Sequence, residues 1–259
     1  MKKIICLVMA LLMCVCLFAC GKKDADSDLA YIKEKGTLVV GITNFAPMDY
    51  PDDNGEWIGF DADMAREFAK YLGVDVQFIE IDWDNKALEL SNKSIDCVWN
   101  GMTLRPEVTN VMDCSNPYCK NAQVVVVNSA VADQYKSKED LGGLVFAVEA
   151  GSAGEEAVKE LGNEYTSVLT QADALMNVAA GTADACVIDL LMAGAMIGEG
   201  TSYPDLTYTV ELTSEEYGVG FRQGSDVVAE FNKFYSESFK SGKVEEIAVV
   251  YGVQESIIG

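Results

Sequence analysis

Short apolar runs alternate with amphipathic stretches along most of this chain. Residues 37–42 and 123–127 are nearly continuous apolar runs, which are typical of strands that are buried on both faces. Between such runs, large apolar residues recur every four positions over residues 60–72 and predict one apolar helical face, with Gly73 at the position that commonly ends a helix. The alternation predicts an α/β protein whose sheets are covered by helices.

The same patterns predict the remaining elements. We expect strands at residues 37–42, 74–79, 95–99, 123–127, 144–148, 185–188 and 217–221. We expect helices at residues 60–72, 85–90, 155–161, 172–180, 190–197, 226–240 and 244–251. These elements form two successive groups of about ninety residues each, which predicts two lobes.

The first residues have the pattern of a secretory signal. Lys2 and Lys3 precede an apolar run that ends at Ala19 and is too short to span a membrane comfortably as a permanent helix. The run closes in Leu-Phe-Ala-Cys-Gly at residues 17–21, which resembles a bacterial lipobox and implies removal of residues 1–19 and a lipid on Cys20. The alternative is an ordinary signal peptide in which Cys20 is incidental.

A polar segment follows the lipobox. Residues 20–28 have almost nothing to bury, which predicts a tether that reaches about 30 Å when extended. A lipid on Cys20 would hold the folded body outside the cytoplasm, at the surface of the cell membrane, without inserting it.

Charge and composition exclude several classes of function. The formal net charge is −22, and removal of residues 1–19, which hold two lysines and no acidic residue, makes it −24. So acidic a chain is not expected to bind nucleic acid, which requires clustered Lys and Arg. The chain has no histidine, which excludes Ser-His-Asp and Cys-His catalysis and most zinc sites. We expect no cofactor, no metal site and no catalytic residue.

Four cysteines belong to the expected folded body: Cys97, Cys114, Cys119 and Cys186. Their spacing matches no metal-binding motif. Cys114 and Cys119 can form a local disulfide in an oxidising compartment, and four buried free thiols are an equally good interpretation.

Several sequence blocks occur in the order and spacing of one protein family. They are VVG at residues 39–41, FAPMDY at 45–50, GFDADMA at 59–65, WNGMTL at 99–104, AGSAG at 150–154, ADA at 183–185 with Asp189, and YGV at 217–219. Together they resemble the polar amino-acid-binding proteins of ABC importers, solute-binding protein family 3, which have the type 2 periplasmic-binding fold. The resemblance covers nearly all of residues 36–251.

The resemblance implies an architecture and a set of partners. It implies an α/β fold of two lobes, one from residues 29–117 plus 212–259 and the other from residues 118–211. Two hinge crossings would lie near residues 118–123 and 211–217. A small polar ligand, an amino acid, would bind between the lobes and favour their closed state. The implied protein is a monomer that delivers its ligand to the permease and ATPase of an ABC importer.

Matching positions also imply ligand-binding residues. Phe45 and Trp83 match aromatic residues that cover the ligand, although a place in the core is the alternative for both rings. Gly101 matches a position whose carbonyl accepts from the ligand ammonium, and Thr103 matches a hydroxyl that bridges both ends of the ligand.

A second group of matching positions lies in the other expected lobe. Ser152 and Ala153 match a turn whose N–H groups hold the ligand carboxylate at a helix start, and a plain N-cap is the alternative, which is compatible with the first role. Asp189 matches the carboxylate that pairs with the ligand ammonium, and for this residue too a helix N-cap is the alternative.

One position departs from the family pattern. Where the family usually carries an arginine that grips the α-carboxylate, this chain has Val108, which cannot do so. Arg105 can turn into the cleft and replace it, or it can be a solvated loop residue. Glu149 adds an acidic group near the expected side-chain pocket, so we hypothesise a preference for a cationic or amide ligand side chain over an acidic one.

Two other classes of function remain open from the sequence. Cyclohexadienyl-dehydratase-like enzymes resemble this fold, and here only Glu149 or Asp189 would serve as a general acid or base. A ligand-sensing module is the third class, but such modules continue into a transmembrane helix and a signalling domain, whereas this sequence stops at Gly259.

Overall fold

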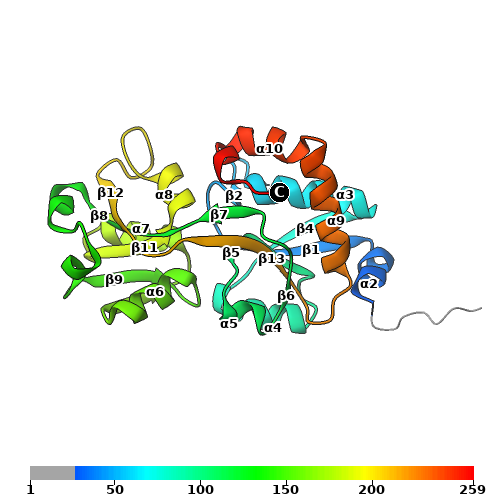
Figure 1. The fold of residues 1–259 in the computed structure, drawn as a ribbon, viewed down its shortest axis with the longest axis horizontal. Coiled ribbons are helices and arrows are strands. Elements are labelled where there is room, and N and C mark those ends of the chain that lie inside the picture. Colours follow the sequence, from blue (N-terminus) through cyan, green and yellow to red (C-terminus); the bar gives the residue numbers. More distant parts are fainter. Residues whose placement is uncertain (1–26) are drawn as a thin grey trace, which may run out of the picture.

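Two α/β lobes, joined by two crossing segments, make up the part of the chain that the computed structural model describes, residues 27–259 (Figure 1). The expected signal segment at residues 1–19, the lipid site at Cys20 and most of the expected tether lie outside the described residues. Asp28, which we expected in the tether, begins a helix instead, and Ser27 lies just before that helix as its N-cap. The Ser27 hydroxyl accepts from the N–H of Ala30 and caps α2 (Asp28–Lys35).

Lobe 1 is built on a sheet with the strand order β4-β1-β5-β13-β6, and β7 also pairs with β13. Its parallel strands β1 and β4 are joined through a helix, as an α/β unit requires. Figure 1 shows α3, α9 and α10 on one face of this sheet, and α4 and α5 on the other. The elements are β1 (Thr37–Ile42), α3 (Phe60–Leu72), β4 (Asp75–Glu80), α4 (Lys86–Ser91), β5 (Cys97–Thr103), α5 (Pro106–Thr109), β6 (Asp113–Cys114), β7 (Cys119–Asn121), β13 (Glu215–Phe221), α9 (Val227–Lys240) and α10 (Lys243–Tyr251).

Lobe 2 is built on a sheet with the order β10-β9-β11-β8-β12. Its central strands are almost fully buried, as their apolar runs predict. The elements are β8 (Gln123–Asn128), β9 (Val145–Glu149), α6 (Ala153–Leu161), β10 (Glu164–Val168), α7 (Gln171–Ala179), β11 (Ala185–Asp189), α8 (Leu190–Met196) and β12 (Leu206–Glu211).

The chain crosses between the lobes twice. It leaves lobe 1 through β7 and enters lobe 2 at β8, and it returns from β12 to β13, so that these segments run side by side between the two bodies (Figure 1). The two-lobed α/β fold with two hinge crossings, predicted from the sequence, is confirmed. The division at residues 29–117 plus 212–259 and 118–211 stays a prediction.

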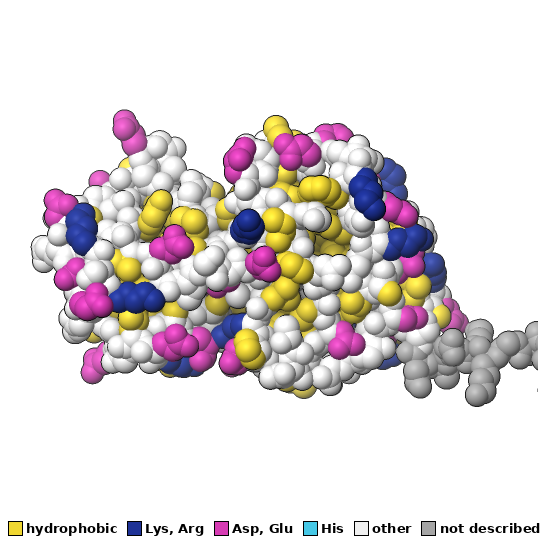
Figure 2. All heavy atoms as spheres, in the orientation of Figure 1, with side chains coloured by type: hydrophobic (Ala, Val, Ile, Leu, Met, Phe, Trp, Pro, Cys, Tyr) yellow, Lys and Arg dark blue, Asp and Glu magenta, His cyan; other side chains and the backbone are white. Residues whose placement is uncertain are grey.

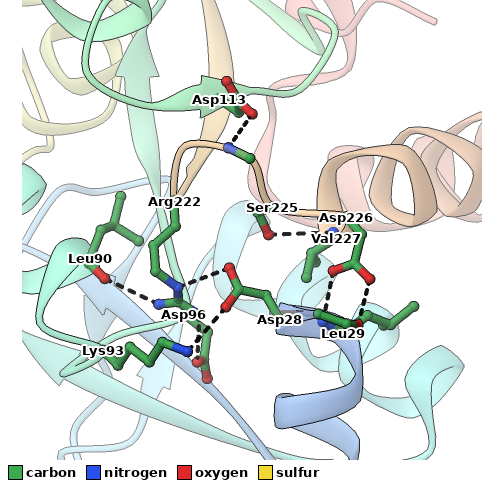
Figure 3. A network of polar contacts seen from close by, with 12 residues as sticks. Asp28, Leu29, Leu90, Lys93, Asp96, Asp113, Arg222, Ser225, Asp226 and Val227 are labelled. Carbon is green, nitrogen blue, oxygen red and sulfur yellow. Dashed lines mark hydrogen bonds and ion pairs between the residues drawn. The ribbon is translucent and has the colours of Figure 1, made fainter. Parts of the chain in front are cut away.

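A buried ion network ties the start of the described chain to lobe 1 (Figure 3). The guanidinium of Arg222 pairs with Asp28 at 2.9 Å and with Asp96 at 3.4 Å, and it donates to the backbone oxygens of Leu90 and Ile95. The side chains of Arg222, Asp28 and Asp96 are all at least nine-tenths buried. Because α2 lies at the end of lobe 1 away from lobe 2 in Figure 1, the network fixes where the chain enters the folded body.

Two further expectations bear on the described chain. Its four cysteines are free thiols, so Cys114 and Cys119 form no disulfide. Cys97, Cys119 and Cys186 are buried, as the other interpretation predicts, but Cys114 is only partly buried. Among the helices of residues 27–259, none combines the length and apolar character that a membrane span requires.

Candidate functional site

A narrow cavity lies between the lobes and is lined by residues of both. Figure 2 shows the surface hollowed where the lobes meet, with acidic side chains spread over both. The structure brings all nine predicted ligand-binding residues to the wall of this cavity: Phe45, Trp83, Gly101, Thr103, Arg105, Glu149, Ser152, Ala153 and Asp189. Six residues that we did not predict complete the wall: Thr43, Lys86, Asn100, Met102, Val108 and Gln171.

The two aromatic side chains are buried and also line the cavity. Phe45 packs edge-on against Tyr217, with ring centroids 6.3 Å apart. Trp83 lies with the ammonium group of Lys86 4.9 Å from its ring centroid. Each ring is therefore buried as a core residue is and also lines the cavity. A place in the core and a role in covering the ligand are compatible for both residues.

Gly101 bends the end of β5 into the cavity. Its φ is +56°, which favours glycine, and a side chain there would collide with the ring of Phe45. The Gly101 N–H donates to the buried carboxylate of Asp61 at 2.7 Å, which fixes the peptide plane. Two residues further on, the Thr103 hydroxyl donates to Glu215 at 2.9 Å.

The first turn of α6 meets the cavity from lobe 2. The Ser152 hydroxyl accepts from the N–H of Glu155 at 3.1 Å, so Ser152 is the N-cap, and Ala153 begins the helix. The N–H groups of a first helical turn have no acceptor within the helix, and the helix dipole favours an anion beside them. The N-cap role and the predicted carboxylate-holding role are therefore compatible.

Asp189 ends β11 with its side chain surrounded by donors. Although it precedes α8, its carboxylate makes no capping hydrogen bond. It accepts instead from the side-chain amides of Asn121, Gln123 and Gln171 and from the hydroxyl of Tyr217. Burial, followed by the charge of nearby Glu215, raises the pKa of Asp189 to about 8. The plain N-cap alternative does not describe this side chain.

Arg105 points into the cleft and reaches across it. Its Nη2 donates to the backbone oxygen of Gly151 in lobe 2 at 2.9 Å. Its Nη1 is buried and, in the described part of the chain, has no hydrogen-bond partner. Val108, at the family's usual arginine position, lines the same cavity. The side chain of Arg105 therefore lines the cleft and is not that of a solvated loop residue. Its replacement of the absent arginine stays a prediction.

Glu149 and Lys86 put one acidic and one basic side chain in the same region. Glu149 is 3% exposed, and its Oε1 has no partner within residues 27–259. Burial and the charge of Asp189 raise the pKa of Glu149 to about 8. Lys86 donates to the backbone oxygens of Trp83 and Gly151, and burial and the charge of Arg105 lower its pKa to about 8.

Lys86 is the most informative residue that the sequence analysis missed. It follows Trp83 by three residues at the start of a short helix, and residues at that spacing share one face. This spacing was the available signal. Of the other five, Asn100 and Met102 lie in the WNGMTL block, and Val108 occupies the family's usual arginine position. Thr43 and Gln171 have no comparable signal in the sequence.

Comparison with known proteins assigns the family. A family model described as bacterial extracellular solute-binding proteins, family 3, matches residues 38–254. The chain belongs to this family. It is thus an extracytoplasmic solute-binding protein with the type 2 periplasmic-binding fold, as the solved structures similar to it also indicate.

Among similar proteins, the arginine-binding extracellular protein ArtP of Bacillus subtilis is 28% identical, with 95% of this chain and 96% of that protein covered. The L-cystine-binding protein TcyA of the same organism is 30% identical, with 96% of each covered. A mutant of ArgBP from T. maritima has a TM-score of 0.80 at 33% identity, covering 86% of this chain and 98% of that one. The ancestral amino acid-binding protein AncCDT-1, described as a precursor of cyclohexadienyl dehydratase, has a TM-score of 0.79 at 32% identity, covering 87% and 99%.

Proposed function

We propose that this protein binds an L-α-amino acid in the cleft between its lobes and delivers it to an ABC importer. Two buried atoms carry the proposal: Arg105 Nη1 and Glu149 Oε1 line one cavity, and neither has a hydrogen-bond partner among the described residues. A buried polar atom without a partner is costly. A ligand that brings both a carboxylate and a hydrogen-bond donor satisfies both atoms.

The α-carboxylate is assigned to Arg105 and the first turn of α6. Arg105 offers its free Nη1 from lobe 1, and Ala153 offers its backbone N–H from lobe 2. The N–H of Ser152 already donates to the backbone oxygen of Glu149 at 3.2 Å, so Ser152 contributes the hydrogen of its hydroxyl instead. A ligand carboxylate between them contacts both lobes only when the cleft is closed. Its binding free energy therefore favours the closed state.

The α-ammonium is assigned to Asp189, the carbonyl of Gly101 and the hydroxyl of Thr103. Contact with an ammonium favours the charged carboxylate, which offsets the burial that raises the pKa of Asp189. Phe45 and Trp83 supply apolar surface for the stem of the ligand.

The ligand side chain is assigned to the region of Glu149. A buried carboxylate with a free oxygen fits a cationic or amide group and repels an acidic one. The names of ArtP and ArgBP are consistent with an arginine ligand, and the name of TcyA makes L-cystine a second candidate. Arginine is the first ligand to test.

The rest of the proposal concerns how the protein is held and used. A lipid on Cys20 anchors it to the cell membrane after residues 1–19 are removed, and a monomer with lobes at 29–117 plus 212–259 and at 118–211 presents its closed form to the permease. No catalytic step is included. Conversion of an arogenate-like substrate by the purified protein would point to the dehydratase-like alternative instead, with Glu149 or Asp189 as its acid or base.

A thermal-shift screen tests the ligand assignment. The purified protein is melted with L-arginine, L-glutamine, L-glutamate and L-cystine, each at one concentration. A ligand at 100 times its Kd adds about 2.7 kcal/mol to the free energy of unfolding, which raises Tm by about 5–10 °C for a chain of this size. We expect arginine or glutamine to raise Tm more than glutamate does. Tighter binding of glutamate in a calorimetric titration would contradict the side-chain assignment.

A further inference from the structure

Glu215, the first residue of β13, lies in the second hinge crossing and accepts hydrogen bonds from the first crossing and from lobe 1. Its Oε1 accepts from the hydroxyl of Thr103 at 2.9 Å, from the amide of Asn121 at 2.7 Å and from the amide of Gln123 at 2.7 Å. Thr103 ends a strand of lobe 1, whereas Asn121 and Gln123 belong to the first crossing. One carboxylate thus connects the second crossing to the first crossing and to the wall of the cavity.

Glu215 and Asp189 share two donors. The amides of Asn121 and Gln123 donate to both carboxylates, with Gln123 lying 3.1 Å from Asp189 Oδ1. No Lys or Arg of residues 27–259 forms an ion pair with either carboxylate within 4.0 Å. Two neighbouring carboxylates that only neutral groups contact attract a cation.

The hydroxyl of Thr103 has one hydrogen, and that hydrogen is directed at Glu215. The hydroxyl oxygen keeps its acceptor capacity and lines the cavity. It therefore accepts from an N–H of a ligand and does not donate to a carboxylate. The bridging role that the family resemblance implies for Thr103 is thereby restricted to the amine end.

We propose that Glu215 is a positioning residue for the α-ammonium of the ligand. It holds Thr103 as an acceptor and, through the amides of Asn121 and Gln123, holds Asp189 toward the same group. Closure of the hinge and capture of the ammonium then depend on one set of hydrogen bonds. The inference rests on the proposed function, because it requires that an amino acid places its amine at Asp189.

The test compares Glu215→Gln with Glu216→Gln. The two residues are adjacent in β13, and both substitutions remove one charge, but Glu216 is exposed and its side chain makes none of these hydrogen bonds. Calorimetry measures the Kd of L-arginine and of 5-guanidinopentanoic acid, which lacks only the α-amino group. L-glutamine and its deaminated analogue form a second pair of probes.

We expect Glu215→Gln to weaken binding of the amino acids about 10- to 100-fold, the range for hydrogen bonds to charged groups. The deaminated analogues should bind wild type and Glu215→Gln equally, and Glu216→Gln should match wild type with every probe. If Glu215 only stabilises the hinge, Glu215→Gln will weaken the binding of amino acids and of their deaminated analogues by the same factor, and the assignment is then wrong. Unchanged binding of the amino acids would also overturn it.

A melting curve shows whether Glu215→Gln folds. If it does not fold, a second variant tests the same assignment. Thr103→Val removes the hydroxyl alone and should cause the same selective loss for amino acids. An equal loss for the analogues would overturn the assignment. If wild type binds none of L-arginine, L-glutamine, L-glutamate and L-cystine, the proposed function fails and the assignment fails with it. A failure confined to the variants affects only Glu215.

Discussion

Closure of the cleft can be tested at Gly151, which connects lobe 2 to lobe 1. Its backbone oxygen accepts from Arg105 at 2.9 Å and from Lys86 at 3.1 Å. A Cβ added at Gly151 would lie 2.7 Å from Asp84 Oδ1 and 2.9 Å from Asp84 Cα. The Cα cannot rotate away as the end of a side chain can, so Gly151→Ala should oppose closure.

The size of the effect follows from these distances. Carbon atoms in contact normally lie ~3.5 Å apart, so the new Cβ is about 0.6 Å too close to Asp84 Cα and the lobes must separate by that amount. The hydrogen bonds from Arg105 and Lys86 then lengthen to about 3.5 and 3.7 Å, beyond the normal range. Each contributes about 1.5–3 kcal/mol, part of which water recovers. We expect the closed state to lose about 1–3 kcal/mol, which weakens ligand binding about 5- to 150-fold.

The matched control is Gly181→Ala. Gly181 also lies in lobe 2, with a φ of +71° against +69° for Gly151, but a Cβ there meets no atom within 4 Å. Both variants should therefore lose about 1–2 kcal/mol of unfolding free energy in the absence of ligand, from backbone strain. In calorimetric titration with L-arginine, only Gly151→Ala should bind more weakly. Equal affinities for the two variants would refute the inference that this contact belongs to the ligand-binding state.

The remaining predictions concern charge. Burial raises the pKa of both Asp189 and Glu149 to about 8, so each carboxyl group binds a proton more tightly in the folded than in the unfolded protein. In melting curves of the ligand-free protein, the stability that these two groups contribute should be greatest below about pH 4 and should be lost as the pH rises to about 8. The affinity for an amino acid should rise with pH up to about 8, because the ligand ammonium requires a charged Asp189 carboxylate. Calorimetry at pH 7 in two buffers should therefore detect proton release on binding, and an affinity that falls with rising pH would contradict this. Glu149→Gln should lower the affinity for L-arginine about tenfold and leave that for L-glutamate unchanged or higher, and the same loss for both would place the side chain elsewhere. Arg222→Met removes the partner that Asp28 and Asp96 share, although Lys93 still pairs with Asp28 at 3.7 Å and Lys35 with Asp96 at 2.6 Å. Denaturant unfolding should therefore show about 1.5–3 kcal/mol less stability, and a change below about 0.5 kcal/mol would mean that Arg222 contributes little to the network in Figure 3.

The strands and helices that the sequence predicted are those with one clear pattern. β8, β9 and β11 are buried on both faces and have continuous apolar runs, and α3 has a regular apolar face. The missed strands β10 and β12 lie at the two edges of the lobe 2 sheet and are partly exposed, so their sequences are mixed. The missed helix α2 depends on a cap and a buried ion network, which joins residues far apart in the sequence.

In the candidate site too, some residues could be predicted from the sequence and others could not. Family motifs predicted residues at the ends of strands, such as Gly101 and Asp189, because their backbone positions define the cleft. They did not predict the direction of Arg105, which is decided by a backbone oxygen in the opposite lobe. They also did not predict Glu215, whose role depends on three donors from other segments. Contacts across the hinge arise only when both lobes are folded and brought together.

Calorimetric titration of wild type and Asp189→Ala with L-arginine tests the central claim most directly, namely that a buried carboxylate of lobe 2 receives the ammonium of an amino acid. Asp205→Ala, which removes an exposed charge from the same lobe, is the control. Loss of one partner of a buried charge pair costs about 2–5 kcal/mol, so Asp189→Ala should bind at least about 30-fold more weakly while still melting cooperatively. Asp205→Ala should bind as wild type does. Equal affinity of Asp189→Ala and wild type would contradict the account.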